Sequence, residues 1–545
     1  MMKIRILATG AFVGGILTAP LIVLMYLGKQ IAGLLFAPFD LFNWIALVLP
    51  GAVITFGIDL MIDSMLFLGI NVADSAKIAE QVMALALFLL FGIIAGAIFF
   101  WVLSLRQYKT GLLDGIVIGM LFGLPVVVIS VGLGDTTILP VLSLLWLFVL
   151  FLVWGLVLCW SYRRLYAVEP DELTSEDDSA KVVRIDRRQF LIVLGGTAAA
   201  ITVVGSGLGA FLASTERRRQ EDALVASGTH KSEGTGLSPF PNADDPVVAP
   251  PGTRPEYTPL KDHYKVFIEL EPTVIDSTTW KLPITGLVDN PLMLTLEDLR
   301  TKYQPRHQST TLSCISGRVG TSLIGTTMWT GASLQEILTE ANVRSKARYL
   351  NIISADGFHE SVDLDLIASD KRIMLCYAWD GTPLSVDHGS PLRIWLPDRY
   401  GMKQPKWITG IVVTDEYQQG YWVERNWDEI AQVKTTSVID TVAVDAIIEN
   451  GSQRLVPLSG IAFSGARGIS KVDVRVDGGS WEPAQLRAPL SETTWVIWRY
   501  EWPFEAGTHT FEVRCGEGDD TPQIEEERAS RPSGATGIHM ESVDI

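Results

Sequence analysis

Long apolar runs dominate the first 215 residues, whereas the remainder of the chain alternates short apolar and polar stretches. A helix that spans a membrane needs about 20 mostly apolar residues. Five runs meet this length and predict spanning helices, at residues 6–27, 82–105, 111–133, 138–162 and 190–213. The sequence therefore predicts an α-helical membrane bundle over residues 1–215.

A further apolar stretch, residues 43–70, is ambiguous because Pro50 and Gly51 interrupt it and Asp59 and Asp63 make it polar. Lys and Arg of multi-pass proteins gather in short cytoplasmic loops. They gather here at Lys3 and Arg5, at Arg106 and Lys109, and at Arg163, Arg164, Lys181, Arg184, Arg187 and Arg188. All three clusters lie inside only if residues 43–70 do not cross once, so we expect a re-entrant or interfacial segment. If this segment does cross, the N-terminus lies outside; both arrangements place the chain after residue 215 on the outer face.

The last apolar run begins like an export signal. In "DRRQFLIVLGGTAAAITVVGSG", residues 186–207, a pair of arginines precedes Phe190 and Leu191 and a weakly apolar, Gly/Ala-rich run, as in twin-arginine signals. Asp186 and Ile192 depart from that pattern, and two ordinary basic residues beside a helix are the alternative. No small-x-small cleavage site follows, so we expect the helix to remain as an anchor.

The rest of the chain predicts a linker and two domains. Residues 216–262 are rich in Gly, Pro, Ser and charge, which predicts a tether. Over residues 263–436, strand-like "WKLPITGLV" and "YLNIISADG" mix with short amphipathic helices started by Thr295 and Ser333, which indicates an α+β domain. Residues 437–545 alternate at period two between glycine turns, which is typical of an all-β, immunoglobulin-like sandwich.

Composition narrows the function classes. The formal net charge is −17, and no block of basic residues offers a nucleic-acid surface. The first histidine is His230, so the membrane half has no histidine pair for a b-type haem, and Cys-x-x-Cys-His is absent, so we expect no haem in this chain. No P-loop motif suggests ATP-driven transport.

Only four cysteines occur in 545 residues, so no disulfide framework is expected. Cys159, Cys376 and Cys515 lie in apolar or strand-like runs, where a small buried hydrophobe explains them. Cys314, inside "TTLSCISGRVGTSLIGTTMWTG", is not explained in this way. From the residues alone, it is packing, half of a disulfide, a nucleophile with His307 nearby in sequence, or a metal ligand.

Further motifs follow in order: "TLSCISGRVG" with "WTGASLQEIL", then "SADGF", then "DHGSPLRIWLPDRYGMKQPKWITGI", then "GYWVERNW". In order and spacing, residues 255–436 resemble the sulfite-oxidase family of molybdopterin-dependent oxidoreductases, and more narrowly its membrane-anchored prokaryotic branch. The sandwich resembles the dimerisation domain of that family, so the resemblance covers over half of the chain.

The resemblance implies a role for each matching residue. Cys314 would be the thiolate ligand of molybdenum, a soft donor for a metal also held by the pterin dithiolene. The resemblance also implies a set of cofactor-binding residues: Tyr264, Lys265, Ser354, Asp356, His388, Arg393, Lys403, Gln404, Pro405 and Lys406. Of these, His388 and Arg393 would meet the pterin phosphate and ring edge.

The substrate side departs from the family pattern. Trp427 stands where sulfite oxidases carry a tyrosine beside the metal, and Arg318 and Arg425 are the candidates for an anion pocket. An indole N–H donates but cannot accept a hydrogen bond. Sulfite is therefore not the expected substrate.

The leading hypothesis is a molybdenum-cofactor oxidoreductase in the cytoplasmic membrane of a prokaryote, with its active site outside and a small-molecule substrate. Electrons would pass to a separate carrier, namely a quinone, a cytochrome or a copper protein, and the sandwich suggests a homodimer. The first alternative is a non-catalytic membrane receptor or scaffold that keeps the fold without the cofactor. The second is a transporter, which would rest on four acidic residues in or near spans: Asp59, Asp63, Asp114 and Asp135.

Overall fold

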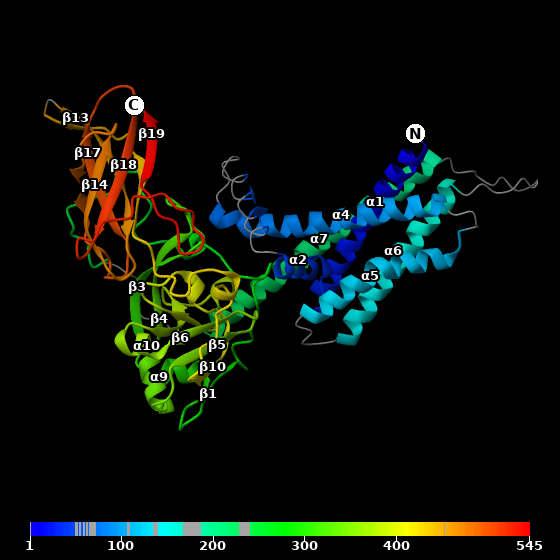
Figure 1. Cartoon of the computed structure of the whole chain (residues 1–545), viewed down its shortest axis with the longest axis horizontal. Helices are drawn as coiled ribbons and strands as arrows, with labels where there is room; N and C mark the ends of the chain where they lie inside the picture. Colours follow the sequence, from blue (N-terminus) through cyan, green and yellow to red (C-terminus); the bar gives the residue numbers. More distant parts are fainter. Residues whose placement is uncertain are drawn as a thin grey trace, which may run out of the picture. The chain divides into compact units, whose positions relative to one another are not determined.

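The structure is a computed structural model that describes residues 2–49, 72–105, 110–133, 140–166, 187–227, 240–451 and 453–545, with Val53, Phe56, Gly57, Leu60, Met61 and Ser64. The chain divides into two compact units, one built from most of the N-terminal helical residues and one that includes everything from Asp222 to Ile545 (Figure 1).

The N-terminal unit is built from helices joined by short non-helical segments in its described residues. Its helices are α1 (Met2–Ala32), α2 (Ala37–Val48), α4 (Val72–Leu105), α5 (Leu112–Leu133), α6 (Pro140–Tyr166) and α7 (Arg187–Ser227). Five of them are long and apolar enough to cross a membrane: Ile4–Ala32, Lys77–Leu105, Leu112–Gly132, Val141–Tyr166 and Arg187–Thr215. The five predicted helices are thus confirmed as helices, and their crossing of a membrane stays a prediction.

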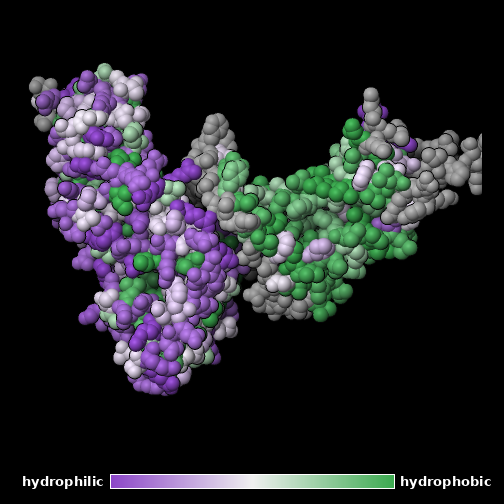
Figure 2. Space-filling model, viewed as in Figure 1, coloured by the Kyte–Doolittle hydropathy of each residue, from purple (hydrophilic) through white to green (hydrophobic). Residues whose placement is uncertain are grey.

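Small residues let these helices pack closely. A Cβ on Gly14 of α1 would lie 2.4 Å from the carbonyl oxygen of Gly92 in α4, and one on Gly155 of α6 would lie 2.3 Å from that of Gly115 in α5. Such small-residue contacts are typical of helices that pack inside a bilayer. Apolar residues such as Leu121 (68% exposed) face outward, and Figure 2 shows apolar residues over the drawn face of this unit.

Several predictions for the helical half concern residues that the structure does not describe. Most of the ambiguous stretch 43–70 lies outside the described residues beyond α2, as do the basic residues at 106, 109, 181 and 184 and the acidic residues at 59, 63 and 135. Asp114 is described. It lies in the first turn of α5 and accepts a hydrogen bond from the Gly111 amide at 2.9 Å, which places it at a helix end.

Two five-stranded sheets enclose the core of the predicted α+β region. The first has the order β2 (Leu292–Thr295), β1 (Lys281–Gly286), β10 (Ile408–Thr414), β5 (Tyr349–Ser354) and β6 (His359–Asp363). The second has the order β3 (Arg306–Ser313), β4 (Ile324–Ser333), β7 (Met374–Trp379) and β8 (Thr382–Pro383), with β9 (Arg393–Trp395) paired to β7. Three short helices complete the region: α8 (Leu296–Thr301), α9 (Leu334–Ala341) and α10 (Leu364–Ser369).

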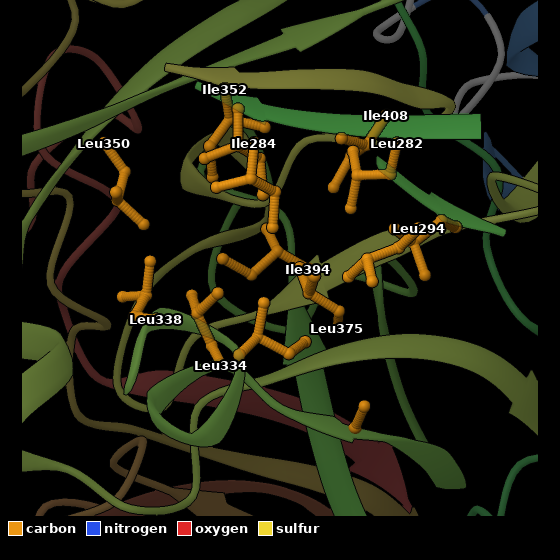
Figure 3. Close-up of a cluster of buried hydrophobic side chains, with 14 of the residues drawn as sticks. Leu282, Ile284, Leu294, Leu334, Leu338, Leu350, Ile352, Leu375, Ile394 and Ile408 are labelled. Carbon is orange, nitrogen blue, oxygen red and sulfur yellow. The ribbon is translucent and has the colours of Figure 1, made fainter. Parts of the chain in front are cut away.

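The sequence signals for these elements are confirmed. The Thr295 side chain accepts from the Asp298 amide and forms a capping box at the start of α8, and the Ser333 side chain accepts from the Glu336 amide at the start of α9. Apolar side chains from both sheets and from α9 meet in one cluster, among them Ile284, Leu334 and Ile394 (Figure 3). This core holds the strands whose ends and loops carry the candidate site.

The C-terminal residues form two sheets with a shared apolar core. One joins β11 (Thr436–Val442), β13 (Gln453–Phe463), β17 (Val496–Pro503) and β16 (Gln485–Leu486), with β12 (Ile448–Asn450) on β13. The other joins β15 (Glu482–Pro483), β14 (Ile469–Val476), β18 (Thr508–Glu517) and β19 (His539–Asp544). Side chains of β13, β14, β17 and β18 share the core between them, so the predicted β-rich region is confirmed.

The predicted tether differs from the structure where the structure describes it. Helix α7 continues past residue 215 to Ser227. Residues 240–262 pack on the C-terminal unit: the Asn242 side chain donates to the Ala488 carbonyl at 2.5 Å, and the Thr258 amide donates to the Thr326 carbonyl at 2.7 Å. Composition alone misses this docking because the contacts are made by isolated polar groups that have no periodicity.

Candidate active site

Cys314 follows directly on β3 and starts the loop that leads to β4. Its amide donates to the Leu323 carbonyl at 3.0 Å, which closes the loop, and its Sγ lies 3.1 Å from Ser316 Oγ. Burial raises the pKa of the thiol, and the Ser316 hydrogen bonds and the positive charge of Lys406 offset this only in part. The thiol by itself is therefore a poor nucleophile, whereas coordination to a metal would deprotonate it outright.

The pairing of Cys314 with His307 is not formed. His307 lies near the other end of β3, seven positions earlier, which is roughly 20 Å at the rise of a strand. Its Nδ1 is 2.9 Å from Thr330 Oγ1. All four cysteines are free thiols, so Cys314 is not half of a disulfide, and Cys376 and Cys515 are buried as predicted.

His388 holds two loops together. It lies in η2 (Val386–His388), with Nε2 3.2 Å from the Tyr264 carbonyl oxygen and Nδ1 2.8 Å from Ser385 Oγ. This geometry fits the neutral tautomer in which Nε2–H donates to the carbonyl and Nδ1 accepts from the hydroxyl. Burial, chiefly, keeps the pKa of His388 well below its usual value. The imidazole therefore positions Tyr264.

Arg393 is a buried cation at the start of β9. Its Nη1 donates to the His388 carbonyl at 3.3 Å, and its guanidinium stands 4.7 Å above the centre of the Trp329 ring. Within the described parts of the chain no carboxylate forms an ion pair with it, and burial lowers the pKa of its guanidinium. A buried charge is stable only with a counter-charge, so this position suits an anionic group such as a phosphate.

Lys406 connects the segment of residues 264–266 to η2. Its ammonium donates to the Val266 carbonyl at 2.9 Å and the Asp387 carbonyl at 3.1 Å, and it lies 4.4 Å from the centre of the Trp407 ring. Lys265, which is half-exposed, forms an ion pair with the Asp387 carboxylate at 2.8 Å. The structure thus brings the predicted residues Tyr264, Lys265 and Lys406 together with His388 and Arg393.

The loop after β5 reaches the same place. The Ala355 amide donates to the Trp407 carbonyl at 2.9 Å, which ties this loop to Lys406 and its neighbour. Ser354 is buried, and its hydroxyl has no hydrogen-bond partner. Burial raises the pKa of Asp356, although the Phe358 amide and the charge of Lys406 act against this.

Three predicted residues instead make contacts within the protein. Lys403 lies in η3 (Gly401–Lys403), and its ammonium forms a 2.6 Å ion pair with the buried carboxylate of Glu360. The Gln404 side chain donates to the Leu396 and Arg399 carbonyls, and the Pro405 carbonyl accepts from the Ile394 amide. The charge of Lys403 is therefore largely neutralised by Glu360.

The structure gives each of the three substrate-side candidates its own surroundings. Trp427 is half-buried in an apolar cluster that includes Ile315 and Tyr400. Arg425 lies on the Tyr421 ring, 3.6 Å from its centre, and donates to the Tyr421 carbonyl at 2.7 Å. Arg318 is exposed on the loop that Cys314 begins.

Two residues that the sequence motifs do not single out, His263 and Tyr400, also lie at the candidate site. The His263 ring lies edge-on to His388, with ring centres 5.4 Å apart; burial lowers its pKa to about 4. Burial raises the pKa of Tyr400 to about 12, with a smaller contribution from the nearby Cys314, and the Tyr400 hydroxyl accepts from the Lys434 amide at 3.0 Å. The sequence signals for these two residues are weak: His263 directly precedes Tyr264, and Tyr400 lies inside "DRYGMK".

The residues fit a polar, anionic organic cofactor. Four buried polar atoms of the residues described above have no hydrogen-bond partner: Tyr264 Oη, His263 Nε2, Ser354 Oγ and Gln404 Oε1. Among the described residues no group of three or more His, Cys, Asp or Glu side chains could hold a metal ion. A metal at Cys314 would thus have to arrive with most of its own ligands. This combination fits the class of molybdopterin-binding oxidoreductases.

Comparison with known proteins narrows the class. Residues 269–422 match the oxidoreductase molybdopterin binding domain. The chain is 35% identical over 152 residues to the "Uncharacterized oxidoreductase YuiH" of Bacillus subtilis, which covers 28% of this chain and 73% of that protein. It is 27% identical over 299 residues to the mitochondrial sulfite oxidase of Mus musculus, covering 46% of this chain and 54% of that protein. It is 27% identical over 260 residues to the NADPH nitrate reductase of Fusarium oxysporum, covering 39% and 29%.

The chain therefore belongs to the sulfite-oxidase family of molybdopterin oxidoreductases. It spans only about a third to a half of the length of the nitrate reductase and sulfite oxidase relatives. Membership of the family therefore does not assign the activities of those whole proteins to this chain.

Proposed function

We propose that this chain is a membrane-anchored molybdenum-cofactor oxidoreductase that carries out two-electron or oxygen-atom transfer on a small substrate. The observation that carries the proposal is the buried Arg393, which has no carboxylate partner in the described residues and lies over Trp329, a ring in the same cluster as Tyr264 and Cys314. The Tyr264 hydroxyl is buried without a hydrogen-bond partner. A cofactor phosphate would supply the counter-charge of Arg393, and the Cys314 thiolate would ligate the metal.

Five residues of the site have a part in holding this cofactor. When bound, the cofactor supplies the redox chemistry. Arg393 and Lys406 offer positive charge, Tyr264 and Ser354 offer hydrogen bonds, and His388 fixes the loop that carries Tyr264. Neutral His388 keeps its proton on Nε2 and does not add a further charge beside Arg393.

Cys314→Ser tests the proposal. We expect the variant to lose the dye-linked turnover of the wild-type chain and to keep its folded state, because a hydroxyl is a poor substitute for a soft thiolate ligand. Cys376→Ala, at a buried cysteine of β7, is the matched control and should keep both metal and turnover. Wild-type activity in Cys314→Ser would show that the ligand assignment is wrong.

We further propose that the catalytic unit lies on the extracytoplasmic side and is exported by the twin-arginine route. The paired arginines at the start of α7 and the apolar run behind them support this. Replacing Arg187 and Arg188 by lysine should leave the catalytic unit on the cytoplasmic side or degraded. Protease applied from outside reports the result, and unchanged access in the double variant would contradict the route.

Electrons need a separate carrier in this proposal. The sequence offers neither a histidine pair in the helical half nor a c-type haem motif, so a quinone, a cytochrome or a copper protein would take up or deliver them. The paired β-sheets at the C-terminus support an immunoglobulin-like dimerisation domain and hence a homodimer. Trp427 favours a substrate other than sulfite, because an indole cannot accept a hydrogen bond.

A further inference from the structure

A cavity of about 40 Å³ adjoins Cys314 on the side of the β-sandwich. One wall comes from the molybdopterin-binding region, through the loop that runs from Cys314 to Ile324 and through Tyr400. The opposite wall comes from β11 and β13 of the sandwich, through Val438, Ile461 and Phe463. At about 10–15 Å³ for each water, this space is large enough for roughly three water-sized groups.

The sandwich wall is apolar and closely packed. Val438, Ile461 and Phe463 are 5%, 1% and 2% exposed, and all three belong to one cluster with Ile315 and Tyr400. Interiors of this density resist rearrangement, so a change of side-chain volume here changes the cavity itself. Phe463 is the bulkiest of the three and therefore contributes most to its size.

Polar contacts fix the sandwich against the molybdopterin-binding region at this point. Arg467 forms ion pairs with Asp398 on one side and Glu517 on the other, the latter at 2.7 Å, and donates to the Val433 carbonyl at 2.7 Å. The Thr311 amide, on the strand that leads to Cys314, donates to the Thr493 carbonyl at 2.9 Å. The distance from Cys314 to the sandwich wall is thus set by the fold.

Three cationic side chains line the cavity: Arg254, Arg318 and Lys434. Arg254 lines it, but Asp440 neutralises this guanidinium through contacts of 2.7 to 3.0 Å. Arg318 also lines the cavity but is exposed to solvent. Lys434, which is half-buried, also lines the cavity, so positive charge lies beside the apolar wall.

We propose that the β-sandwich forms the second wall of the substrate chamber and that Phe463 is a specificity-determining residue. It limits the substituent that approaches Cys314 to a small one. This inference rests on the proposed function only in calling the occupant a substrate. The chamber itself and its limit on size can be measured without the cofactor.

The test uses the full chain from a host that cannot assemble the pterin, so that Cys314 is a free thiol. Its alkylation by iodoacetamide, a small reagent, and by N-phenylmaleimide, a bulky one, is followed at this residue by mass spectrometry. We expect Phe463→Leu to raise the rate with N-phenylmaleimide, relative to iodoacetamide, by about tenfold, the usual effect of a side-chain-sized change in an apolar pocket. Phe511→Leu, in the separate sandwich core of β18, is the control and should leave the ratio unchanged.

A second variant acts in the opposite direction. Val438→Phe fills the chamber from β11 and should slow N-phenylmaleimide more than iodoacetamide. Unchanged rate ratios in folded Phe463→Leu and Val438→Phe would overturn the inference, and if Phe463→Leu does not fold, Val438→Phe alone decides. Molybdenum in the wild-type chain from a cofactor-producing host is assayed separately, so a failure of the proposed function is distinguished from a failure of the chamber.

Discussion

Two turns of the molybdopterin-binding region each hold a buried cation, but they neutralise it differently. The Arg393 turn (residues 386–393) surrounds its guanidinium with a carbonyl and an indole ring and offers no carboxylate among the described residues. The Lys403 turn (residues 400–404) places its ammonium 2.6 Å from Glu360, whose carboxylate also accepts from the Ser361 amide. The charge of Lys403 is neutralised within the protein. The charge of Arg393 has no carboxylate partner among the described residues, so a bound anion would be needed to neutralise it.

This difference distinguishes a buried cation that stabilises the fold from a buried cation that can bind an anionic ligand. Positive charge near the site is common to both turns, and the sequence motif contains both, so sequence resemblance gives them the same role. Only the partner distinguishes them: a cation with an internal carboxylate stabilises the fold, and a buried cation without one is a candidate for binding an anion. The predictions below test this distinction.

The largest effect is expected at Lys403. Lys403→Met leaves the Glu360 carboxylate buried without its counter-charge, which should lower the free energy of unfolding by about 3–5 kcal/mol. Urea unfolding of the cofactor-free full chain, followed by tryptophan fluorescence, measures the change. Because burial already raises the pKa of Glu360, protonation should reduce the loss as the pH falls.

A double variant tests whether Lys403 serves only as the counter-charge of Glu360. Lys403→Met combined with Glu360→Gln removes both charges and should recover most of the stability and retain the cofactor. If the double variant is stable but no longer binds molybdopterin, Lys403 is a cofactor residue after all. The Lys403 turn would then resemble the Arg393 turn.

Arg393→Met should have the opposite signature. The cofactor-free chain should be as stable as the wild type or more so, because an uncompensated buried charge has been removed. Cofactor retention should fall by roughly 30- to 4,000-fold, which corresponds to about 2–5 kcal/mol for losing one partner of a buried charged pair. Pterin fluorescence after denaturation measures retention; a destabilised cofactor-free chain that still binds pterin normally would contradict the assignment.

The buried His263, whose ring contacts His388 of the Arg393 turn, should make the stability of the chain depend on pH. Its pKa of about 4 lies below the usual 6.5 because burial disfavours the cation, and the charges of Arg393 and Lys406 act in the same direction. The folded state thus binds fewer protons than the unfolded state, so stability is full above about pH 6.5 and is lost as the pH falls towards 4, by about 3 kcal/mol in all. His263→Phe should flatten unfolding curves of the cofactor-free chain over that range. A pH dependence that is identical in wild type and His263→Phe would contradict this account.

The sequence predicts much of the fold because its signals are local. Thr295 and Ser333 start helices through hydrogen bonds to residues three positions away, and strands such as β1 and β5 follow from their apolar pattern. The candidate site is predictable only through the family motifs. The pairing of Lys403 with Glu360 and the burial of His263 join residues far apart in the chain, and neither pattern nor composition carries that information.

The smallest effect is expected at Trp427. Trp427→Tyr places a phenol where this chain has an indole, and a hydroxyl that both donates and accepts should favour a small oxyanion by about 1–3 kcal/mol. Sulfite kcat/KM of molybdenum-replete protein should therefore rise by roughly 5- to 150-fold. Trp422→Tyr, at an aromatic neighbour with ring centres 6.2 Å away, is the control and should not raise it. A wild-type kcat/KM for sulfite near about 10⁶ M⁻¹s⁻¹, well inside the usual enzyme range, would contradict the inference from Trp427.

X-ray absorption at the molybdenum edge shows directly whether Cys314 is a ligand of molybdenum. In the purified full chain it should show one molybdenum per chain with sulfur ligands, and Cys314→Ser should lose one of those sulfur ligands while Cys376→Ala keeps them all. An identical sulfur shell in Cys314→Ser, or a wild-type chain without molybdenum after expression in a cofactor-producing host, would contradict the account.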